Sequence, residues 1–269
     1  MRLVVTSWNI NSVRARIGHV LRHLDEVAPD VLCLQETKCP DDRFPLAPLR
    51  AAGYHHIAVN GQKGYHGVAV LSRLPFASTD VIGFCDRNDC RHIAVRLGYG
   101  AAAGVVIHNF YVPAGGDIPD PELNPKFAHK LAFLDEMQAW GSRTQPAANR
   151  SILVGDLNVA PYESDVWSHK ALLGVVSHTP AETERLERVR RAAGFVDAVR
   201  HLRPEPERVF TWWSYRSPDF TVNDRGRRLD HVWLSADLVP ALRAAEVDRA
   251  ARSWERPSDH VPVTVTLQV

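Results

Sequence analysis

Several short apolar runs in this sequence adjoin side chains that can ligate a metal ion or move a proton. The set comprises Asn9 and Asn11, residues 35–38 (QETK), residues 108–111 (HNFY), Asp156 and Asn158, Asp230 with His231, and residues 258–260 (SDH). Each segment alone is weak evidence, because an isolated carboxylate at a strand end is usually solvated. Together they predict a cluster rich in oxygen ligands where strands end.

A cluster of several carboxylates repels itself unless a hard cation such as Mg²⁺ or Mn²⁺ neutralises it. Such a cation beside an Asp–His pair suits phosphoryl transfer, because it neutralises phosphate oxygens and lowers the pKa of water. A carboxylate that binds a histidine orients the imidazole and supports its charge. The sequence has no G-x-x-x-x-G-K-[ST] loop, which excludes a P-loop nucleotidase, and neither G-x-G-x-x-G nor a G-x-S-x-G elbow occurs.

The elements that would carry these residues follow from the apolar pattern. Runs rich in Val, Ile and Leu predict strands at 3–8, 31–35, 67–71, 93–97, 105–111, 152–155, 229–234 and 261–267. Apolar stripes predict helices along 13–24, with Asn11 or Ser12 as its cap, along 127–137 and along 186–193. Strands outnumber helices and often follow one another directly. We therefore expect two packed sheets with helices outside, not an alternating doubly wound sheet.

Two of the predicted strands end alike. The run 3–8 leads into Asn9 and Asn11, and the run 152–155 leads into Asp156 and Asn158. Residues i and i+2 of a strand share a face, and ligand sites often lie at the carboxyl ends of strands. Each pair could therefore point into one site, or it could instead be a pair of Asx residues that cap a turn. The sequence leaves both interpretations open.

Composition limits the class of protein. The 269 residues contain 32 Lys and Arg against 31 Asp and Glu, a net charge of +1, whereas proteins that bind nucleic acid by bulk charge are strongly basic. Four cysteines are too few for a disulfide framework in a chain of this length. The N-terminus lacks the apolar core of a signal peptide, and no stretch suits a membrane span. We expect a cytoplasmic protein with reduced thiols and no membrane contact.

The polar segments belong to a longer collinear series of motifs. In chain order these are WNINSVRAR (8–16), LQETK (34–38), GQKGYHGVA (61–69), YVP (111–113), GDLN (155–158), RLD (228–230) and PSDHVP (257–262). Their order and spacing resemble the exonuclease III family of apurinic/apyrimidinic (AP) endonucleases, in the endonuclease/exonuclease/phosphatase superfamily. The resemblance covers residues 1–269 as one catalytic domain. It implies a four-layered α/β sandwich of the DNase I-like type, with two packed mixed sheets flanked by helices.

The resemblance also implies an activity. A member of this family is a Mg²⁺-dependent DNA phosphodiesterase of base excision repair, with Mn²⁺ as a substitute. It would cleave duplex DNA 5′ to abasic sites and have 3′–5′ exonuclease and 3′-phosphatase activity. Its partner would be duplex DNA with abasic sites or blocked 3′ ends, and we expect a bacterial, nucleoid-associated monomer.

The motifs that match the family imply a set of metal ligands. Glu36 corresponds to the principal ligand, with Asn9 and Asp259 completing or supporting the site. The whole expected set is Asn9, Glu36, Asp156, Asn158, Asp259 and His260.

The same resemblance implies the groups that act on the substrate. Asp156 would orient or deprotonate the attacking water, or protonate the leaving group, and Asn158 would hold the nucleophile and the phosphate. His260, paired with Asp230, would contact the scissile phosphate. Tyr111 would support the transition state.

Further residues are expected to contact DNA. The segment FTWWSYR (210–216) matches the family's aromatic strand beside the lesion pocket. A sugar without its base can rest on an aromatic face, so we expect Trp212 to line that pocket, the alternative being a core tryptophan. Arg227 stands where animal relatives place a tryptophan. The expected substrate contacts are Asn11, Arg14, Lys63, Trp212, Arg216 and Arg228.

Two other functions are compatible with the same fold. A nucleic-acid-binding regulator that has lost catalysis would have degenerate ligands, whereas Glu36, Asp156, Asn158 and His260 are all present. A phosphoinositide or sphingolipid phosphodiesterase is disfavoured by the aromatic and Arg-containing segment 210–216 and by residues 35–38.

Overall fold

Two six-stranded sheets lie face to face in the structure, a computed structural model that describes residues 1–216 and 219–269. The first sheet contains, in spatial order, β11 (Leu242–Val247), β12 (Val263–Gln268), β1 (Arg2–Asn9), β2 (Val31–Gln35), β4 (Val68–Ser72) and β3 (His56–Asn60). The second contains β5 (Phe76–Asp80), β6 (His92–Leu97), β7 (Val106–Tyr111), β8 (Ser151–Asp156), β10 (Asp230–Leu234) and β9 (Val196–Asp197). Both sheets are mixed, as expected, because β1–β2 and β7–β8 are parallel and their other neighbours are antiparallel.

The inner faces of the two sheets form the central apolar core. Val5 and Val70 of the first sheet and Ile107 and Val154 of the second are fully buried in one cluster. Burial of each such side chain contributes about 1.5–3 kcal/mol. This core holds the two sheets in fixed relative positions, which a site built from both of them requires.

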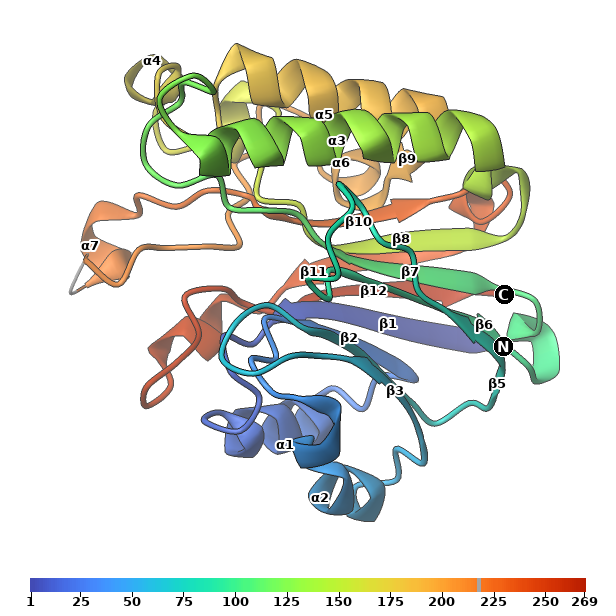
Figure 1. Cartoon of the computed structure of the whole chain (residues 1–269). Helices are drawn as coiled ribbons and strands as arrows, with labels where there is room; N and C mark the ends of the chain where they lie inside the picture. The colour runs from blue at the N-terminus through green and yellow to red at the C-terminus, as the bar shows by residue number, and fades with distance from the viewer. Residues whose placement is uncertain (217–218) are drawn as a thin grey trace.

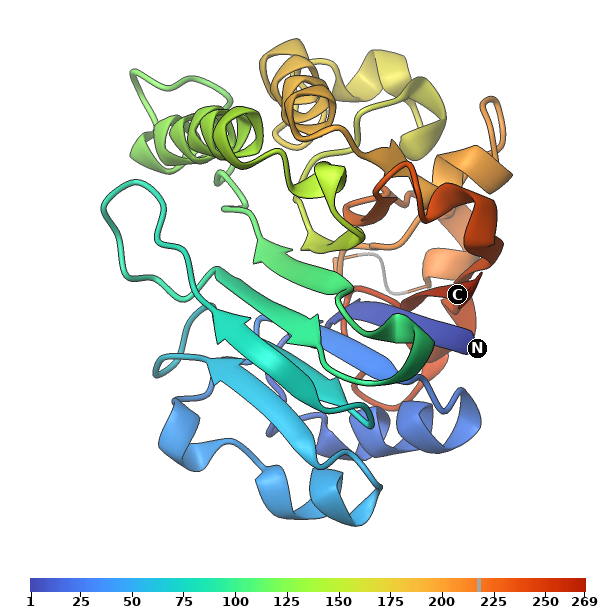
Figure 2. The ribbon, with the colours of Figure 1, turned by 90° about the vertical axis from the view of Figure 1, so that its right-hand side faces the viewer.

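Helices cover the outer face of each sheet (Figure 1). On the second sheet, α3 (Pro125–Thr144) and α5 (Pro180–Ala193) bury Phe133 and Leu186 in a cluster with Trp233 of β10. On the first, α1 (Ile17–Glu26) and α2 (Leu46–Ala51) bury Leu24 and Leu49. Figure 2 shows the resulting order of helices, sheet, sheet and helices from the end that carries both termini. The expected four-layered sandwich is confirmed.

Short helices lie in the connections: α4 (His169–Leu172), α6 (Ala198–Leu202) and α7 (Phe220–Asn223). Within the described residues, no helix has the length and apolar character needed to cross a membrane. All four cysteines are free thiols.

The start of α1 differs from the prediction. The helix begins at Ile17 rather than after Asn11 or Ser12, and residues 13–16 form a turn. The reason is that the preceding chain is bound to the loop after β2: the amide of Ser12 donates to Glu36 O at 2.7 Å and the amide of Val13 donates to Thr37 O at 3.1 Å. The segment that was expected to cap a helix instead lies against Glu36.

Candidate active site

The carboxyl ends of the two parallel strand pairs meet at the end of the sandwich opposite the chain termini (Figure 1). Asn9, the last residue of β1, is paired with Gln35 of β2, and Tyr111 of β7 is paired with Asp156 of β8. Asn9 Nδ2 lies 2.9 Å from Asp156 Oδ2, so the two sheets contact each other through these strand ends. The predicted cluster therefore forms at the junction of both sheets.

The two similar strand ends form the same turn. Asn9 Oδ1 accepts a hydrogen bond from the amide of Asn11 at 3.1 Å, and Asp156 Oδ1 accepts one from the amide of Asn158 at 3.0 Å. Asn11 and Asn158 have φ values of 47° and 52°, in the left-handed region that asparagine tolerates. Both pairs therefore form the Asx turns of one interpretation, and these turns also bring Asn9 and Asp156 into one cluster.

Asn9 bridges two carboxylates as a hydrogen-bond donor. Its Nδ2 lies 3.0 Å from Glu36 Oε1 and 2.9 Å from Asp156 Oδ2. Its Oδ1 is directed at the Asn11 amide, so the nitrogen faces the carboxylates. This arrangement differs from the ligand role expected for Asn9, since a metal ligand must present its oxygen.

Glu36 is held as an anion at the wall of the site. Its Oε2 lies 2.8 Å from Lys38 Nζ, and Tyr111 Oη donates to its Oε1 at 2.8 Å. Burial acts to raise the pKa of Glu36, but Lys38 and the Asn9 hydrogen bond hold that pKa below its ordinary value. Burial and Glu36 raise the pKa of Tyr111 well above its ordinary value, so the phenol stays protonated and donates.

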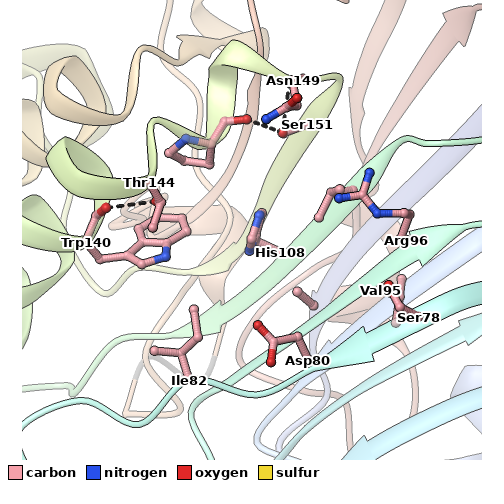
Figure 3. Close-up of a pocket in the computed structure, with 13 residues that line it drawn as sticks. Ser78, Asp80, Ile82, Val95, Arg96, His108, Trp140, Thr144, Asn149 and Ser151 are labelled. Carbon is pink, nitrogen blue, oxygen red and sulfur yellow. Dashed lines mark hydrogen bonds between the residues drawn. The ribbon is translucent and has the colours of Figure 1, made fainter.

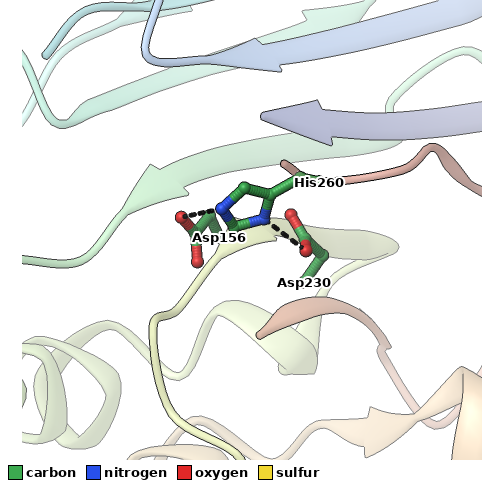
Figure 4. A group of neighbouring side chains, drawn as sticks. All are labelled: Asp156, Asp230 and His260. Atoms are coloured by element: carbon green, nitrogen blue, oxygen red, sulfur yellow. Dashed lines mark hydrogen bonds and ion pairs between the residues drawn. The ribbon is translucent and has the colours of Figure 1, made fainter. Parts of the chain in front are cut away.

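His260 lies between two carboxylates (Figure 4). Its Nδ1 is 2.8 Å from Asp230 Oδ2 and its Nε2 is 3.6 Å from Asp156 Oδ2. Burial acts to lower the pKa of His260, but Asp230 and Asp156 raise it, so the ring carries two protons. Burial raises the pKa of Asp156, with Asp230 adding to the effect and His260 opposing it. Asp156 is therefore suited to exchanging a proton near neutral pH.

A cavity of about 460 Å³ opens beside this network. Its polar lining residues include Glu36, Asn158, Asp259 and His260, and its walls also include Trp212, Val176, Leu229 and Arg227. Trp212 Nε1 donates to Asp259 Oδ2 at 2.9 Å, while Arg227 lies over the Trp212 ring at 5.2 Å from its centroid. The expected position of Trp212 on a pocket wall agrees with this arrangement. Arg216 lines the same cavity, as expected for a substrate contact.

The oxygen donors on the cavity wall fit a hard divalent cation. Glu36, Asp259 and Asn158 face one space, and the amide nitrogen of Asn158 is directed away to Val112 O and Asp156. Carboxylate and amide oxygens are ligands that Mg²⁺ and Mn²⁺ accept. Ligand atoms of Asp156, Asp230 and His260 also lie within 4.8 Å of one another. There, however, protonated His260 lies between the two carboxylates and offsets one negative charge, while the raised pKa of Asp156 favours a shared proton, so we regard this trio as a proton network.

Not all expected substrate contacts lie at this cavity. Arg228 is fully buried, with Nε 2.7 Å from Asp165 Oδ1 and Nη1 2.8 Å from Asp197 Oδ2. It cannot contact DNA from there, which corrects the expectation. Arg14 and Lys63 are exposed but are not among the cavity-lining residues. Asn11 does belong to the site, because its Nδ2 donates to Asp259 Oδ1 at 3.0 Å.

His108 is also separate from the site, although it lies on the same strand, β7, as Tyr111. It faces a different cavity of about 350 Å³, lined also by Asp80, Trp140 and Ser151 (Figure 3). Ser151 and Asp156 are opposite ends of β8, so this cavity lies away from the active-site network.

Two supporting residues were missed by the sequence interpretation. Thr211 Oγ1 donates to Asp230 Oδ2 at 2.6 Å and fixes that carboxylate. Arg91 lies over the Tyr111 ring at 4.9 Å from its centroid. Thr211 lies within the aromatic segment that the sequence singled out, so its position was a usable signal, whereas no local motif marked Arg91.

The sandwich and its acidic, histidine-containing edge define a DNase I-like hydrolase. The sequence pattern of the Endonuclease/Exonuclease/phosphatase family matches residues 6–260, and the chain belongs to this family. Exodeoxyribonuclease III of Haemophilus influenzae is 31% identical over 267 residues, which cover 96% of this chain and 97% of the relative. The protein is thus an exodeoxyribonuclease III-like nuclease.

Solved structures agree with this assignment. An AP endonuclease from Archaeoglobus fulgidus is 30% identical, superposes with a TM-score of 0.90, and matches 99% of this chain and 100% of that one. The 3′ phosphatase NExo from Neisseria, bound to a product DNA hairpin, gives the same TM-score of 0.90 at 30% identity and the same coverage. Both are similar to this chain over nearly its whole length.

Proposed function

We propose that this protein is a Mg²⁺-dependent DNA phosphodiesterase of base excision repair. It cleaves duplex DNA 5′ to abasic sites and also acts as a 3′–5′ exonuclease and 3′-phosphatase, with Mn²⁺ as a substitute cation. The observation that carries the proposal is the chain from Asp156 through His260 to Asp230, beside Glu36 and at the edge of one cavity. Relatives with AP endonuclease and 3′-phosphatase activity support it.

Asp156 and Asn158 prepare the attacking water in this proposal. Asp156 has a raised pKa and therefore takes up a proton readily. Asn158 Nδ2 donates to Val112 O at 2.9 Å and to Asp156 Oδ2 at 3.1 Å, which leaves its carbonyl oxygen free to accept a hydrogen bond from the attacking water. Correct orientation of both groups lowers the barrier because the reacting atoms need no further ordering.

His260 and Tyr111 stabilise the charge that develops on phosphate. Asp230 keeps His260 protonated, so the imidazolium donates to a phosphate oxygen while its other nitrogen stays with Asp230. Tyr111 would supply a second, neutral donor by exchanging its hydrogen bond to Glu36 for one to the phosphate. Glu36, assisted by Asp259 and Asn158, would hold Mg²⁺, which supplies neutralisation of the phosphate oxygens.

The cavity beside this network would take the abasic sugar. Trp212, Leu229 and Val176 offer apolar surface next to the catalytic network, and Arg227 and Arg216 offer donors. A sugar without a base fits such a surface because it has an apolar ring face and few acceptors to satisfy. A nucleotide that retains its base must in addition be unstacked before it can enter.

A second, basic cavity continues the DNA-binding surface. Its volume is about 640 Å³, and Ala114 and Gly116 belong to the walls of both cavities. Arg87, Lys126 and His129 line it. We propose that the DNA backbone crosses the loop between the two cavities, since Lys and Arg side chains bind phosphates in this way.

Residues 1–269 would act as one catalytic domain and as a monomer, associated with the nucleoid in the bacterial cytoplasm. The bacterial exodeoxyribonuclease relatives support this placement. An inactive regulator and a lipid phosphodiesterase are both disfavoured by the complete catalytic network and by the nuclease relatives.

The proposal is tested by incubating the purified protein with three 5′-labelled duplexes. One carries an abasic site, one a 3′-phosphate and one an intact recessed 3′ end. We expect scission 5′ to the abasic site, loss of the 3′-phosphate and shortening of the recessed end with Mg²⁺, and none of these with EDTA. No cleavage of any duplex with Mg²⁺ would refute the proposed function.

A further inference from the structure

A fully buried ion pair lies behind the active-site cavity and has no part in the chemistry described above. Lys130 of α3 and Glu182 of α5 are both completely inaccessible, with Nζ 2.5 Å from Oε1. Burial of two charges is costly unless each is also well hydrogen-bonded. The partners of each charge therefore indicate what the pair holds in place.

Lys130 binds two carbonyl groups of the active-site loops. Its Nζ donates to Asn158 O at 2.7 Å and to Ala114 O at 3.3 Å. Asn158 is in the left-handed conformation, and its side chain is one of the groups that face the cavity. The ammonium thus contacts the peptide that sets the direction of the Asn158 side chain.

The loop at residues 114–116 packs directly on the stem of Lys130. Gly115 has φ +92°, and a Cβ atom at this position would come within 2.8 Å of Lys130 Cδ and 3.0 Å of Val176 Cγ1. Only glycine allows the loop to lie this close in this conformation. The lysine therefore supports the loop that separates the two cavities.

Glu182 holds a neighbouring segment of the cavity wall. Its carboxylate accepts from the amide of Ser177 at 2.9 Å and from Thr179 Oγ1 at 2.7 Å. Arg227 Nη1 in turn donates to Ser177 Oγ at 2.7 Å and to Val176 O at 3.0 Å. One side of the pair therefore fixes residues 114 and 158, and the other fixes residues 176–177 and, through them, Arg227.

We propose that Lys130 and Glu182 are positioning residues that hold three loops of the nuclease site, at 114–116, 158 and 176–177, in register with one another. The inference rests on the proposed function for its catalytic consequence. It predicts that loss of the lysine reduces turnover through the orientation of Asn158, without direct contact between Lys130 and DNA.

The informative variant is Lys130→Met combined with Glu182→Gln. Lys130→Met alone would leave Glu182 buried without its cation. We therefore expect a strongly reduced free energy of unfolding for this single variant. In the double variant, glutamine can still accept from Ser177 and Thr179, while no ammonium contacts Asn158 O and Ala114 O. We expect a thermal midpoint within about 5 °C of wild type, because a buried ion pair is often replaced without net loss.

The double variant should nevertheless have a kcat lower by about 10- to 100-fold on the abasic duplex, the range that a small misplacement of reacting groups produces. Its dissociation constant for the duplex in EDTA should not change. The matched control is Arg185→Met, which removes another ion pair between α5 and α3, Arg185 Nε to Asp135 Oδ1 at 3.0 Å, at an exposed face. That variant should have wild-type kcat. A double variant with wild-type kcat and KM would overturn the proposal.

Hydrogen exchange separates this inference from the proposed function. Amides in peptides that cover 112–118, 156–160 and 175–179 should exchange faster in the double variant than in wild type or Arg185→Met. Unchanged exchange would overturn the positioning role whether or not the protein cleaves DNA. Absence of cleavage by the wild type would instead refute only the proposed function.

Discussion

Asp230 Oδ2 accepts a hydrogen bond from His260 Nδ1 at 2.8 Å, and this contact joins the first residue of β10 to the loop before β12. The two strands belong to different sheets. The pair therefore forms only when the sandwich is assembled, and it fixes the imidazole so that Nε2 is directed toward Asp156.

Replacement of Asp230 by asparagine should reduce kcat on an abasic duplex by about 100-fold or more, within the range attributed to positioned acid–base groups. The physical reason is that His260 loses both its orienting acceptor and the charge that keeps it protonated. Steady-state kinetics at saturating Mg²⁺ measure the effect, with circular dichroism as a check on folding. Asp237→Asn, which alters an acid bonded to Ser235 beyond the far end of β10, is the control and should keep wild-type kcat. Equal kcat for the two variants would contradict the assigned role.

Trp212 offers a way to separate stacking from hydrogen bonding. Trp212→Ala should raise KM for an abasic duplex by about 5- to 150-fold, corresponding to loss of about 1–3 kcal/mol of aromatic contact. Trp212→Phe keeps a ring but loses the donor to Asp259 Oδ2. This variant should retain most of the affinity for the duplex. Because Asp259 is one of the expected Mg²⁺ ligands, the remaining defect should be a higher Mg²⁺ concentration for half-maximal rate. Wild-type KM for Trp212→Ala would exclude the tryptophan from the substrate pocket.

Arg228 should contribute to stability and not to DNA affinity. Arg228→Met leaves Asp165 and Asp197 with one cation fewer inside the protein, and we expect urea unfolding to show a loss of about 3–5 kcal/mol. Arg216→Ala, at the exposed cavity wall, should change stability by less than about 0.5 kcal/mol. It should instead lower the slope of log Kd against log salt by about 1, as expected for one lost phosphate contact. A lower salt slope for Arg228→Met, with little loss of stability, would instead indicate that Arg228 contacts DNA.

His23 makes the stability depend on pH, apart from the active site. Burial lowers the pKa of His23 from 6.5 to about 4. Above pH 6.5 the side chain is neutral in both folded and unfolded states and contributes nothing. As the pH falls below 6.5 the unfolded state takes up the proton first, so the free energy of unfolding decreases until the folded pKa is reached.

From this shift, wild type should lose about 2.5 kcal/mol through His23 between pH 7 and pH 4.5. His23→Gln removes this titration, so its stability should decrease less over the same interval. Urea unfolding at the two pH values gives the comparison. An equal decrease in both proteins would show that His23 does not carry the effect.

The sequence predicted the interior of the fold well and its edges poorly. All the strands that lie inside the two sheets coincide with apolar runs, because such strands are covered on both faces. The strands that were missed are β3, β5, β9 and β11, which form the four sheet edges. The residues of β5 after Phe76 are all exposed, so no apolar pattern marks this strand.

The candidate site could be predicted as a set of residues but not as a set of contacts. From the order of the motifs we expected Glu36, Asp156 and His260 to lie in one cluster, and the structure brings them together. The direction of the Asn9 amide depends on a turn hydrogen bond to Asn11, which residue type alone does not specify. Lys130 falls within the predicted helix 127–137 but is not one of its apolar positions, so its burial and its bond to Asn158 O could not be foreseen without the packing of α3 on the loops.

The most direct test of the central claim is single-turnover cleavage of a 5′-labelled abasic duplex by wild type and by Asp156→Asn, each with Mg²⁺. Asp156 contacts both Asn9 and Asn158 and faces His260, so its charge is the centre of the assigned network. We predict rapid Mg²⁺-dependent scission by the wild type and a rate at least about 1000-fold lower for the variant, with duplex binding retained. A variant that cleaves at a rate close to wild type would contradict the assignment of this network as the active site.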